Sequence, residues 1–321
     1  MPQMTPGQAR VIDPVLTNVA RGYKNGKFVG TTLFPVVPVA QRGGKIISFG
    51  REHFRLYNTG RAPGASIAQV QFGHSGGDYS LTQHAIEGKV PVELMEEARE
   101  VPGIDLGAAA VRGVQDIIGL RLEHGQAALA RDASRYADGS KLSLSGDDLW
   151  TDPESDPVAV MALARETVRR QVGRAPNVAV LGASVVAALK VHPKVVDRIK
   201  YTGRDVATLE LLASLFELQK VESGDAVFAD DAGALQDVWG GDVVVAYSEI
   251  GTLASSGTPS YGYTYRLRNH PLVREAHWDH QTQSWLYPVF DEISPVMAGP
   301  AAGFLIQNAV SFEAAEEEPE E

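Results

Sequence analysis

The chain has 321 residues, a formal net charge of −11 and 44% hydrophobic residues, and it contains no cysteine. This length allows about two compact units, each with a buried core, and the absence of cysteine excludes disulfides, iron–sulfur ligation and thiol catalysis. Charge is unevenly distributed, because residues 1–60 hold eight Lys/Arg and two Asp/Glu, whereas six Glu lie in the last nine residues.

The beginning of the chain predicts two extended segments. Residues 1–44 show little helical periodicity and are interrupted by Pro35, Pro38, Gly43 and Gly44, which predicts an arm. The first ten residues lack the apolar stretch of a secretory signal, so an intracellular origin is expected. Residues 45–89 alternate like strands around turn-rich breaks, which predicts a long two-stranded ribbon. Such a hairpin is marginally stable alone, so it is expected to rest on another surface.

A long helix is predicted next. Asp105 is its expected N-cap, and apolar residues recur at helical spacing to about Asp138. At 1.5 Å per residue the helix would be roughly 50 Å long. Its four glycines each cost about 1 kcal/mol relative to alanine, so packing has to stabilise it. After a polar loop, Asp156 and Pro157 predict the start of a second helix, which Gly173 ends.

The remainder predicts a mixed α+β region. The expected elements are a strand at 177–181, helices at 184–192 and 206–216 and strands at 243–247, 261–267 and 285–290. The uncharged run 293–312 has the length of a membrane span, but its prolines and glycines predict a buried loop followed by a strand. Residues 313–321 contain too few apolar side chains to fold and are expected to be solvated.

One arrangement is typical of an enzyme. Ser184 lies between an apolar strand and a helix, like a nucleophile elbow, and Asp230 and His277 follow in the chain order of α/β-hydrolases. Val186 replaces the second glycine of the elbow, so the simpler interpretation is that Ser184 caps the helix. A serine hydrolase that uses Ser184 is therefore kept as a distant alternative.

Histidines near the C-terminal third suggest a metal site. His270, His277 and His280 lie close in sequence to Glu275 and Asp279, but without the i, i+4 spacing of a zinc enzyme. Packed or surface histidines are the favoured interpretation. The sequence thus predicts no catalytic residue, no metal and no cofactor.

Two charged sets are candidate contact residues. An acidic face precedes the long helix and consists of Glu93, Glu96, Glu97 and Glu100. A solvated face is the default interpretation, whereas the more specific one is that it pairs with arginines of the arm and ribbon. Those arginines are Arg42, Arg51, Arg55 and Arg61.

The order of basic arm, ribbon, long helix and mixed region resembles the major capsid proteins of tailed bacteriophages, which have the Hong Kong ninety-seven type fold. Short stretches similar to that family's sequences are spread over about residues 20–310. They are 59–64 (TGRAPG), 144–150, 155–157, 173–177 (GRAPN), 189–193 (LKVHP), 200–202, 259–264 (PSYGYT) and 299–304 (GPAAGF).

The resemblance implies an α+β capsid fold with named parts. They are an N-terminal arm (1–44), an E-loop ribbon (45–89), a P-domain with a spine helix (90–156), a mixed α/β A-domain (157–285), return strands of the P-domain (286–312) and the acidic tail (313–321). It also implies self-assembly as hexamers and pentamers into an icosahedral head shell around double-stranded DNA. An encapsulin-type compartment is the nearest alternative.

The resemblance also sets expectations about partners and place. A portal protein would contact the shell, and decoration proteins are a further candidate partner. DNA would be bound without sequence specificity, and no membrane is expected to be involved. Only some 20 residues precede Gly22, so a separate scaffolding protein is expected. No lysine lies between Lys45 and Lys89, which predicts a shell without isopeptide cross-links. Assembly is expected in the host cytoplasm and the final location is the virion.

Overall fold

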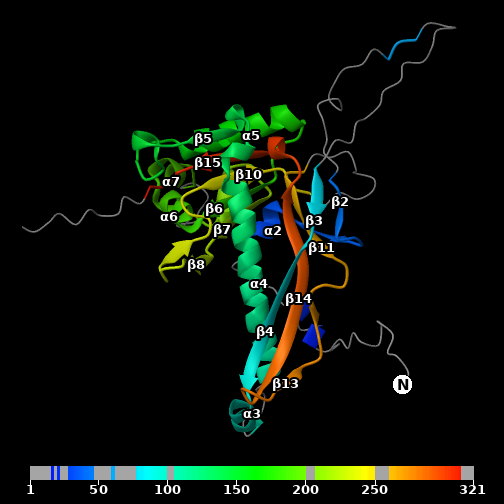
Figure 1. Cartoon of the computed structure of the whole chain (residues 1–321). Helices are drawn as coiled ribbons and strands as arrows, with labels where there is room; N and C mark the ends of the chain where they lie inside the picture. The colour runs from blue at the N-terminus through cyan, green and yellow to red at the C-terminus, as the bar shows by residue number, and fades with distance from the viewer. Residues whose placement is uncertain are drawn as a thin grey trace, which may run out of the picture.

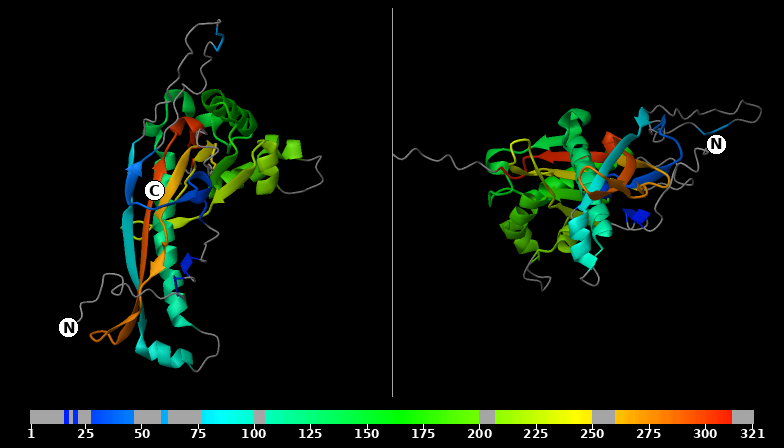
Figure 2. Two further views of the ribbon diagram at one scale, coloured as in Figure 1. Left: turned by 90° about the vertical axis from the view of Figure 1, so that its right-hand side faces the viewer. Right: turned by 60° about the horizontal axis from the view of Figure 1, so that its bottom comes forward.

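The computed structural model describes residues 16–17, 20–21, 28–46, 59–61, 77–99, 105–199, 207–249 and 260–311. In this part of the chain, long strands run beside one long helix, α4 (Leu106–Arg131) (Figure 1). A second, more compact sheet with its helices lies at one end of this body, and α3 (Val92–Arg99) lies at the other (Figures 1 and 2). The predicted contact residues Arg51, Arg55 and Glu100 and the acidic tail fall outside the described residues.

The first sheet is organised around β14 (Ser284–Met297). One edge of β14 pairs antiparallel with β4 (Thr82–Pro91) over the whole length of β4. The other edge pairs in turn with β13 (His277–Asp279), β12 (Leu272–Val273) and β11 (Gly262–Leu267). A parallel strand, β1 (Val36–Val39), completes the six. This six-stranded sheet packs against α4 through a core that contains Val111, Val114, Ile118, Val289 and Ile293.

The second sheet has the order β5 (Lys141–Ser143), β15 (Gly303–Gln307), β10 (Val243–Ala246), β6 (Val178–Gly182) and β7 (Lys220–Gly224). Every residue of β6 and β10 is buried, as expected for continuous apolar runs in central strands. The helices that pack here are α5 (Pro157–Val172), α6 (Ala183–Val191), α7 (Pro193–Ile199) and α8 (Leu209–Leu215). Within the uncharged run 293–312, β15 is the predicted strand, whereas residues 293–297, predicted as loop, are the end of β14.

Each sheet combines strands from distant parts of the chain. β15 lies in the five-stranded sheet, where it pairs with β10 and β5. Conversely, β11, β12 and β13 belong to the six-stranded sheet, although they fall inside 157–285. The arm is also shorter than predicted, because α2 (Gly30–Leu33) and β1 pack into this chain's own core, where Leu33 and Phe34 are fully buried.

The long helix starts as predicted and ends earlier. The Asp105 side chain accepts a hydrogen bond from Ala108 N at 2.9 Å, which caps the first turn. The helix ends at Arg131 instead of continuing to about Asp138. There the Asp132 side chain accepts from Ser134 N and starts a separate 3₁₀ turn, so a local side-chain bond competes with helix continuation. Two of its glycines allow close packing: a Cβ at Gly107 would lie 2.9 Å from the Tyr287 ring, and one at Gly119 would lie 2.6 Å from Phe28.

Local capping signals place α5 correctly. Asp156 accepts from Ala159 N, Pro157 occupies the first turn, and Gly173 ends the helix with a φ of 70°. The remaining elements are two short strand pairs, β2 (Gly43–Lys45) with β3 (Asp78–Ser80) and β8 (Val227–Ala229) with β9 (Leu235–Asp237), and the 3₁₀ helices Ala133–Arg135, Asp138–Ser140, Gly146–Asp148 and Pro300–Ala302. Among the described helices, none combines the length and apolar character needed to cross a bilayer.

Candidate assembly surfaces

Arg42 lies at the base of the predicted ribbon, in the turn between β1 and β2. Its guanidinium forms a two-pronged ion pair with Glu292 of β14, with Nε–Oε2 at 2.6 Å and Nη2–Oε1 at 2.9 Å. The Arg42 side chain is 65% exposed, whereas that of Glu292 is 5% exposed. His270 Nε2 lies 3.8 Å from the same carboxylate. Arg42 therefore joins the start of the ribbon to the six-stranded sheet of its own chain and still presents an exposed surface.

Arg42→Ala is expected to lower the melting temperature of the unassembled subunit, because it removes two charge-assisted hydrogen bonds from the buried Glu292 carboxylate. Differential scanning fluorimetry measures the shift. Arg268→Ala removes an exposed arginine from the turn after β11 and is the matched control. Equal melting temperatures for the two variants would show that the Arg42 ion pair contributes nothing to the subunit.

The acidic face lies on α3, far from the ribbon base. Glu93, Glu96 and Glu97 are exposed on this helix, and Leu94 beside them is 50% exposed. β3 directly precedes β4 and α3 directly follows it, so the ten residues of β4 separate the two sites by about 33 Å. Arg61, the other described arginine of the set, is exposed. Within one chain, the structure does not bring the acidic face and Arg42 together.

The hydrolase arrangement is not assembled. Ser184 Oγ donates to Gly240 O at 3.5 Å, and His277 lies on β13 of the other sheet, paired with Leu286. Asp230 closes the β8–β9 turn by accepting from Ala232 N and Ala234 N. The capping interpretation of Ser184 was also wrong, because the residue that precedes the helix is Gly182 and α6 has no side-chain cap.

The histidines that were considered for a metal site lie in or beside the six-stranded sheet. His270 faces Glu292, while His280 packs edge-on against Trp278 near the β13–β14 turn. The Asp279 carboxylate accepts from Gln281 N and Thr282 Oγ1, which close that turn. In the part of the chain that the structure describes, no three potential metal ligands converge.

Buried carboxylates, which sequence reasoning missed, connect the two sheets. Glu123 of α4 accepts hydrogen bonds from Val29 N and Gly30 N at 3.0 Å and from Trp239 Nε1 at 2.7 Å. Burial raises the pKa of this carboxyl, and the three hydrogen bonds only partly oppose the increase. Glu123 thus caps the N-terminus of α2 and connects it to α4 and to the loop before β10.

A second carboxylate joins the end of α4 to the five-stranded sheet. Asp242 binds Arg131 Nε at 2.6 Å through one oxygen and accepts from Asn308 N at 2.9 Å through the other. Arg131 also donates to Val238 O at 3.0 Å.

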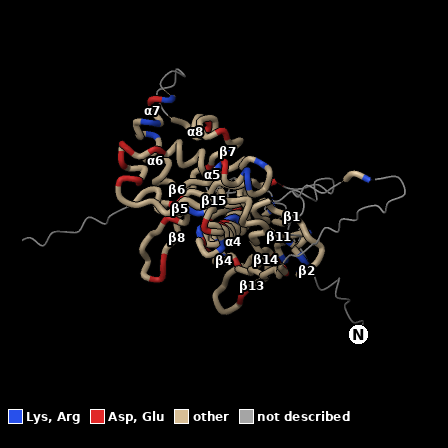
Figure 3. The backbone as a smooth tube through the Cα atoms, turned by 90° about the horizontal axis from the view of Figure 1, so that it is seen from above, with Lys and Arg blue, Asp and Glu red and all other residues tan. Residues whose placement is uncertain are grey.

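A third buried carboxylate lies in the six-stranded sheet. Asp291 is fully buried 3.0 Å from Arg266, and burial raises the pKa of its carboxyl. Charged positions otherwise lie mostly on outer turns and helices (Figure 3).

Comparison with known proteins gives consistent matches. A family model described as phage major capsid protein E matches residues 137–291. The major capsid protein of Burkholderia phage BcepMu is 38% identical over 92% of this chain and 96% of its own length. The crystal structure of a phage-related protein from Bordetella bronchiseptica is 44% identical, with a TM-score of 0.80 over 94% of this chain and 98% of the other.

More distant structures share the fold alone. The mature capsid of bacteriophage PhiM1 aligns with a TM-score of 0.53 at 14% identity, over 89% of this chain and 88% of the other. The SrpI encapsulin of Synechococcus elongatus aligns with a TM-score of 0.54 at 13% identity, over 94% of this chain and 97% of the other. A long helix flanked by these two sheets is therefore the Hong Kong ninety-seven type fold of shell-forming proteins. The chain belongs to the phage major capsid protein family and is a structural component of the virion.

Proposed function

We propose that copies of this chain form hexamers and pentamers that close into the icosahedral head shell of a tailed bacteriophage around double-stranded DNA. The family membership supports self-assembly into a phage shell. The observation that carries the proposal is the placement of charge. Arg42 stays 65% exposed although it binds its own Glu292, and it lies at the opposite end of β4 from the acidic helix α3, too far away for the two to pair within one chain.

Contacts between copies follow from this placement. The basic set (Arg42, Arg51, Arg55 and Arg61) on one copy faces the acidic set (Glu93, Glu96, Glu97 and Glu100) on a neighbour. Head-to-tail contacts between different surfaces close into rings, as hexamers and pentamers require. In this proposal residues 45–89 act as an E-loop, α4 is the spine of the P-domain, and the five-stranded sheet with its helices is the core of the A-domain.

Electron microscopy of the purified full-length protein tests the proposal. Closed shells or hexameric rings are expected, and a preparation that stays monomeric at high concentration would overturn it. Glu96→Lys with Glu97→Lys is expected to reduce shell yield without changing the melting temperature of the subunit, because both side chains are exposed. Asp197→Lys on α7 is the control for an added surface charge.

The shell is expected to be held without covalent cross-links, because no lysine lies between Lys45 and Lys89. Purified particles that are boiled, reduced and run on a denaturing gel should give a single band at the 34.5 kDa of the monomer. A ladder of higher bands would contradict this expectation.

Other partners belong to the same proposal. A separate scaffolding protein directs assembly in the host cytoplasm, a portal protein occupies one vertex, and decoration proteins have access to the outer surface. The acidic tail repels DNA if it faces the interior, with a range of about 8 Å at physiological salt, and aids solubility if it faces outward. Efficient formation of correctly sized shells from this chain alone would count against the separate scaffolding protein.

The alternatives are less well supported. An encapsulin-type compartment has the same fold, but the encapsulin match is 13% identical, against 38% for the capsid protein of BcepMu. The structure does not support the hydrolase alternative. Ser184 lies on α6 beside the five-stranded sheet, His277 lies in the six-stranded sheet, and the Asp230 carboxylate accepts hydrogen bonds within the β8–β9 turn. The family and the site thus favour a structural role.

A further inference from the structure

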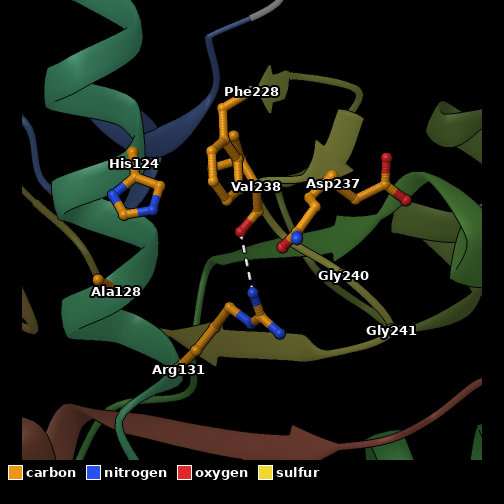
Figure 4. Close-up of a pocket in the computed structure, with 9 residues that line it drawn as sticks. His124, Ala128, Arg131, Phe228, Asp237, Val238, Gly240 and Gly241 are labelled. Carbon is orange, nitrogen blue, oxygen red and sulfur yellow. Dashed lines mark hydrogen bonds between the residues drawn. The ribbon is translucent and has the colours of Figure 1, made fainter. Parts of the chain in front are cut away.

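Two cavities lie beside α4, where residues 225–241, which include the β8–β9 hairpin, face the helix. The larger has a volume of about 380 Å³ and is lined by His124, Ala128 and Arg131 of α4 and by Phe228 and Asp237 of the hairpin (Figure 4). The smaller, of about 260 Å³, is lined by Ile117 and Leu120 of α4 together with Phe28, Asp225 and Val227. These residues come from segments that are nearly ninety or more positions apart in sequence.

The two cavities follow one another along the helix. Their α4 residues are 116, 117, 120, 124, 128 and 131, and all but Asp116 have the three- and four-residue spacing of a single helical face. This stripe, from 117 to 131, is about 21 Å long at 1.5 Å per residue. In the larger cavity the ring of His124 packs edge-on against that of Phe228, with centroids 4.8 Å apart, so α4 contacts the hairpin there. We call this stripe and the facing hairpin the α4–hairpin groove.

The smaller cavity has mainly apolar walls, whereas polar side chains such as His124, Arg131 and Asp237 share the lining of the larger one with Phe228. Ile117 is 55% exposed, Val227 is 47% exposed and Leu235 is 74% exposed, and all three belong to α4 or the hairpin. All of β9 is exposed, and the hairpin extends away from the body of the molecule (Figures 1 and 3). A cluster of exposed aliphatic side chains next to cavities is typical of an interaction site.

The edge of the groove is acidic. Asp225, Asp231 and Asp237 are exposed along the hairpin, whose tip is marked by acidic positions in Figure 3. The one arginine that lines the larger cavity, Arg131, is already neutralised by Asp242 and donates to Val238 O. Phosphate groups of packaged DNA would be repelled here, whereas lysine and arginine side chains would be attracted.

We propose that the α4–hairpin groove binds a basic amphipathic helix of a second polypeptide, which assembles together with the shell. This inference rests on the proposed function, in which a separate scaffolding protein is present. A stripe of 21 Å accepts about four turns of helix. The described helices of this chain are poorer candidates. The exposed leucine of α3 is surrounded by Glu93, Glu96 and Glu97, and Arg169 and Arg170 of α5 are already paired with Glu166.

Peptide binding to purified shells tests the charge and the location. The probe is a fluorescein-labelled helical peptide of leucines and lysines in amphipathic order, compared with the same pattern of leucines and glutamates. The lysine peptide is expected to bind, and Ala128→Trp, which fills the larger cavity, is expected to weaken binding at least tenfold. Ala162→Trp, on the exposed face of α5, is the matched control and should leave binding unchanged. Equal affinity for wild type and Ala128→Trp, or equal binding of the glutamate peptide, would overturn the proposal.

A second variant covers the case in which Ala128→Trp does not fold. Asp237→Lys reverses an exposed charge at the groove and is expected to weaken the lysine peptide, whereas Asp197→Lys on α7 should not. If both variants bind the lysine peptide equally well, the groove is not its site. Shell formation by the wild-type chain is scored separately by electron microscopy, so a failure of peptide binding leaves the proposed function intact.

Photo-cross-linking identifies the natural occupant. Benzoylphenylalanine at position 128, in particles produced with the complete set of phage genes, is expected to cross-link to a basic amphipathic segment of a different polypeptide, identified by mass spectrometry. Cross-links only to another copy of this chain, or no cross-link at all, would overturn the proposal.

Discussion

Glu123→Ala is expected to destabilise the unassembled subunit by about 3 kcal/mol or more. The variant leaves three buried donors without their acceptor, namely Val29 N, Gly30 N and Trp239 Nε1. Each unsatisfied buried group costs about 1–3 kcal/mol, and the relief of burying a carboxylate offsets only part of the sum. Urea unfolding followed by tryptophan fluorescence gives the free energy of unfolding directly, and Trp239 reports on the site itself.

Two further variants separate charge from hydrogen bonding. Glu123→Gln keeps an acceptor oxygen and should lose less stability than Glu123→Ala. Glu154→Ala removes an exposed glutamate and is expected to change stability by less than about 0.5 kcal/mol. If Glu123→Ala unfolds at the same urea concentration as Glu154→Ala, the hydrogen bonds of Glu123 do not stabilise the fold.

The pH dependence of stability follows from the same site. Burial raises the pKa of Glu123 above its ordinary value of 4.5, so the folded state binds this proton more tightly than the unfolded state. Stability relative to Glu123→Gln is therefore greatest below pH 4.5 and declines as the pH rises through the folded pKa. A difference between the two proteins that grows with pH instead would mean that the hydrogen bonds outweigh burial.

Gly182→Ala is expected to prevent folding or to cost about 4 kcal/mol or more. An added Cβ would lie 1.7 Å from Gly240 O, which is backbone and cannot rotate away. Gly182 ends β6, a central strand, and its N–H donates to Asp242 O at 3.1 Å, so neither segment is free to shift. Soluble yield and melting temperature measure the effect.

Gly113→Ala is the matched control for this substitution. No heavy atom lies within 4 Å of a Cβ at Gly113, which occupies the exposed face of α4. Alanine is therefore expected to stabilise the helix by up to about 1 kcal/mol. A soluble Gly182→Ala protein that melts at the wild-type temperature would show that the loop at Gly240 moves aside.

Elements whose signals are local were predicted well. Asp156, Pro157 and Gly173 lie next to the ends of α5 and set them through their own side chains and backbone angles. The start of α4 at Asp105 was predicted for the same reason. The end of α4 was not predicted, because the helical spacing of apolar residues continues past Asp132. The Asp132 carboxylate accepts hydrogen bonds from Ser134 N and Arg135 Nε, and these bonds start a separate turn.

Which sheet each strand joins could not be predicted from the pattern of neighbouring residues. Strand β15 pairs with β10 and β5, which are far away in sequence, and an apolar run of five residues fits either sheet equally well. The exposed arginines and glutamates proposed as contact residues stand out in the sequence because like charges lie close together there. Glu123, Asp242 and Glu292 were missed because a buried carboxylate and a solvated one look alike in sequence, although Glu123 lies among the apolar positions of α4.

The hydrogen bonds of Glu123 and Asp242 affect how much one copy can bend within a curved shell. Asp242 holds both the last turn of α4 and the residue after β15, and Glu123 joins the same helix to α2 and Trp239. Bending between the two sheets would require breaking buried charge-assisted hydrogen bonds at both points. Each copy is therefore expected to move as one rigid unit. In the proposed shell of pentamers and hexamers, differences in curvature would then be accommodated at the contacts between copies.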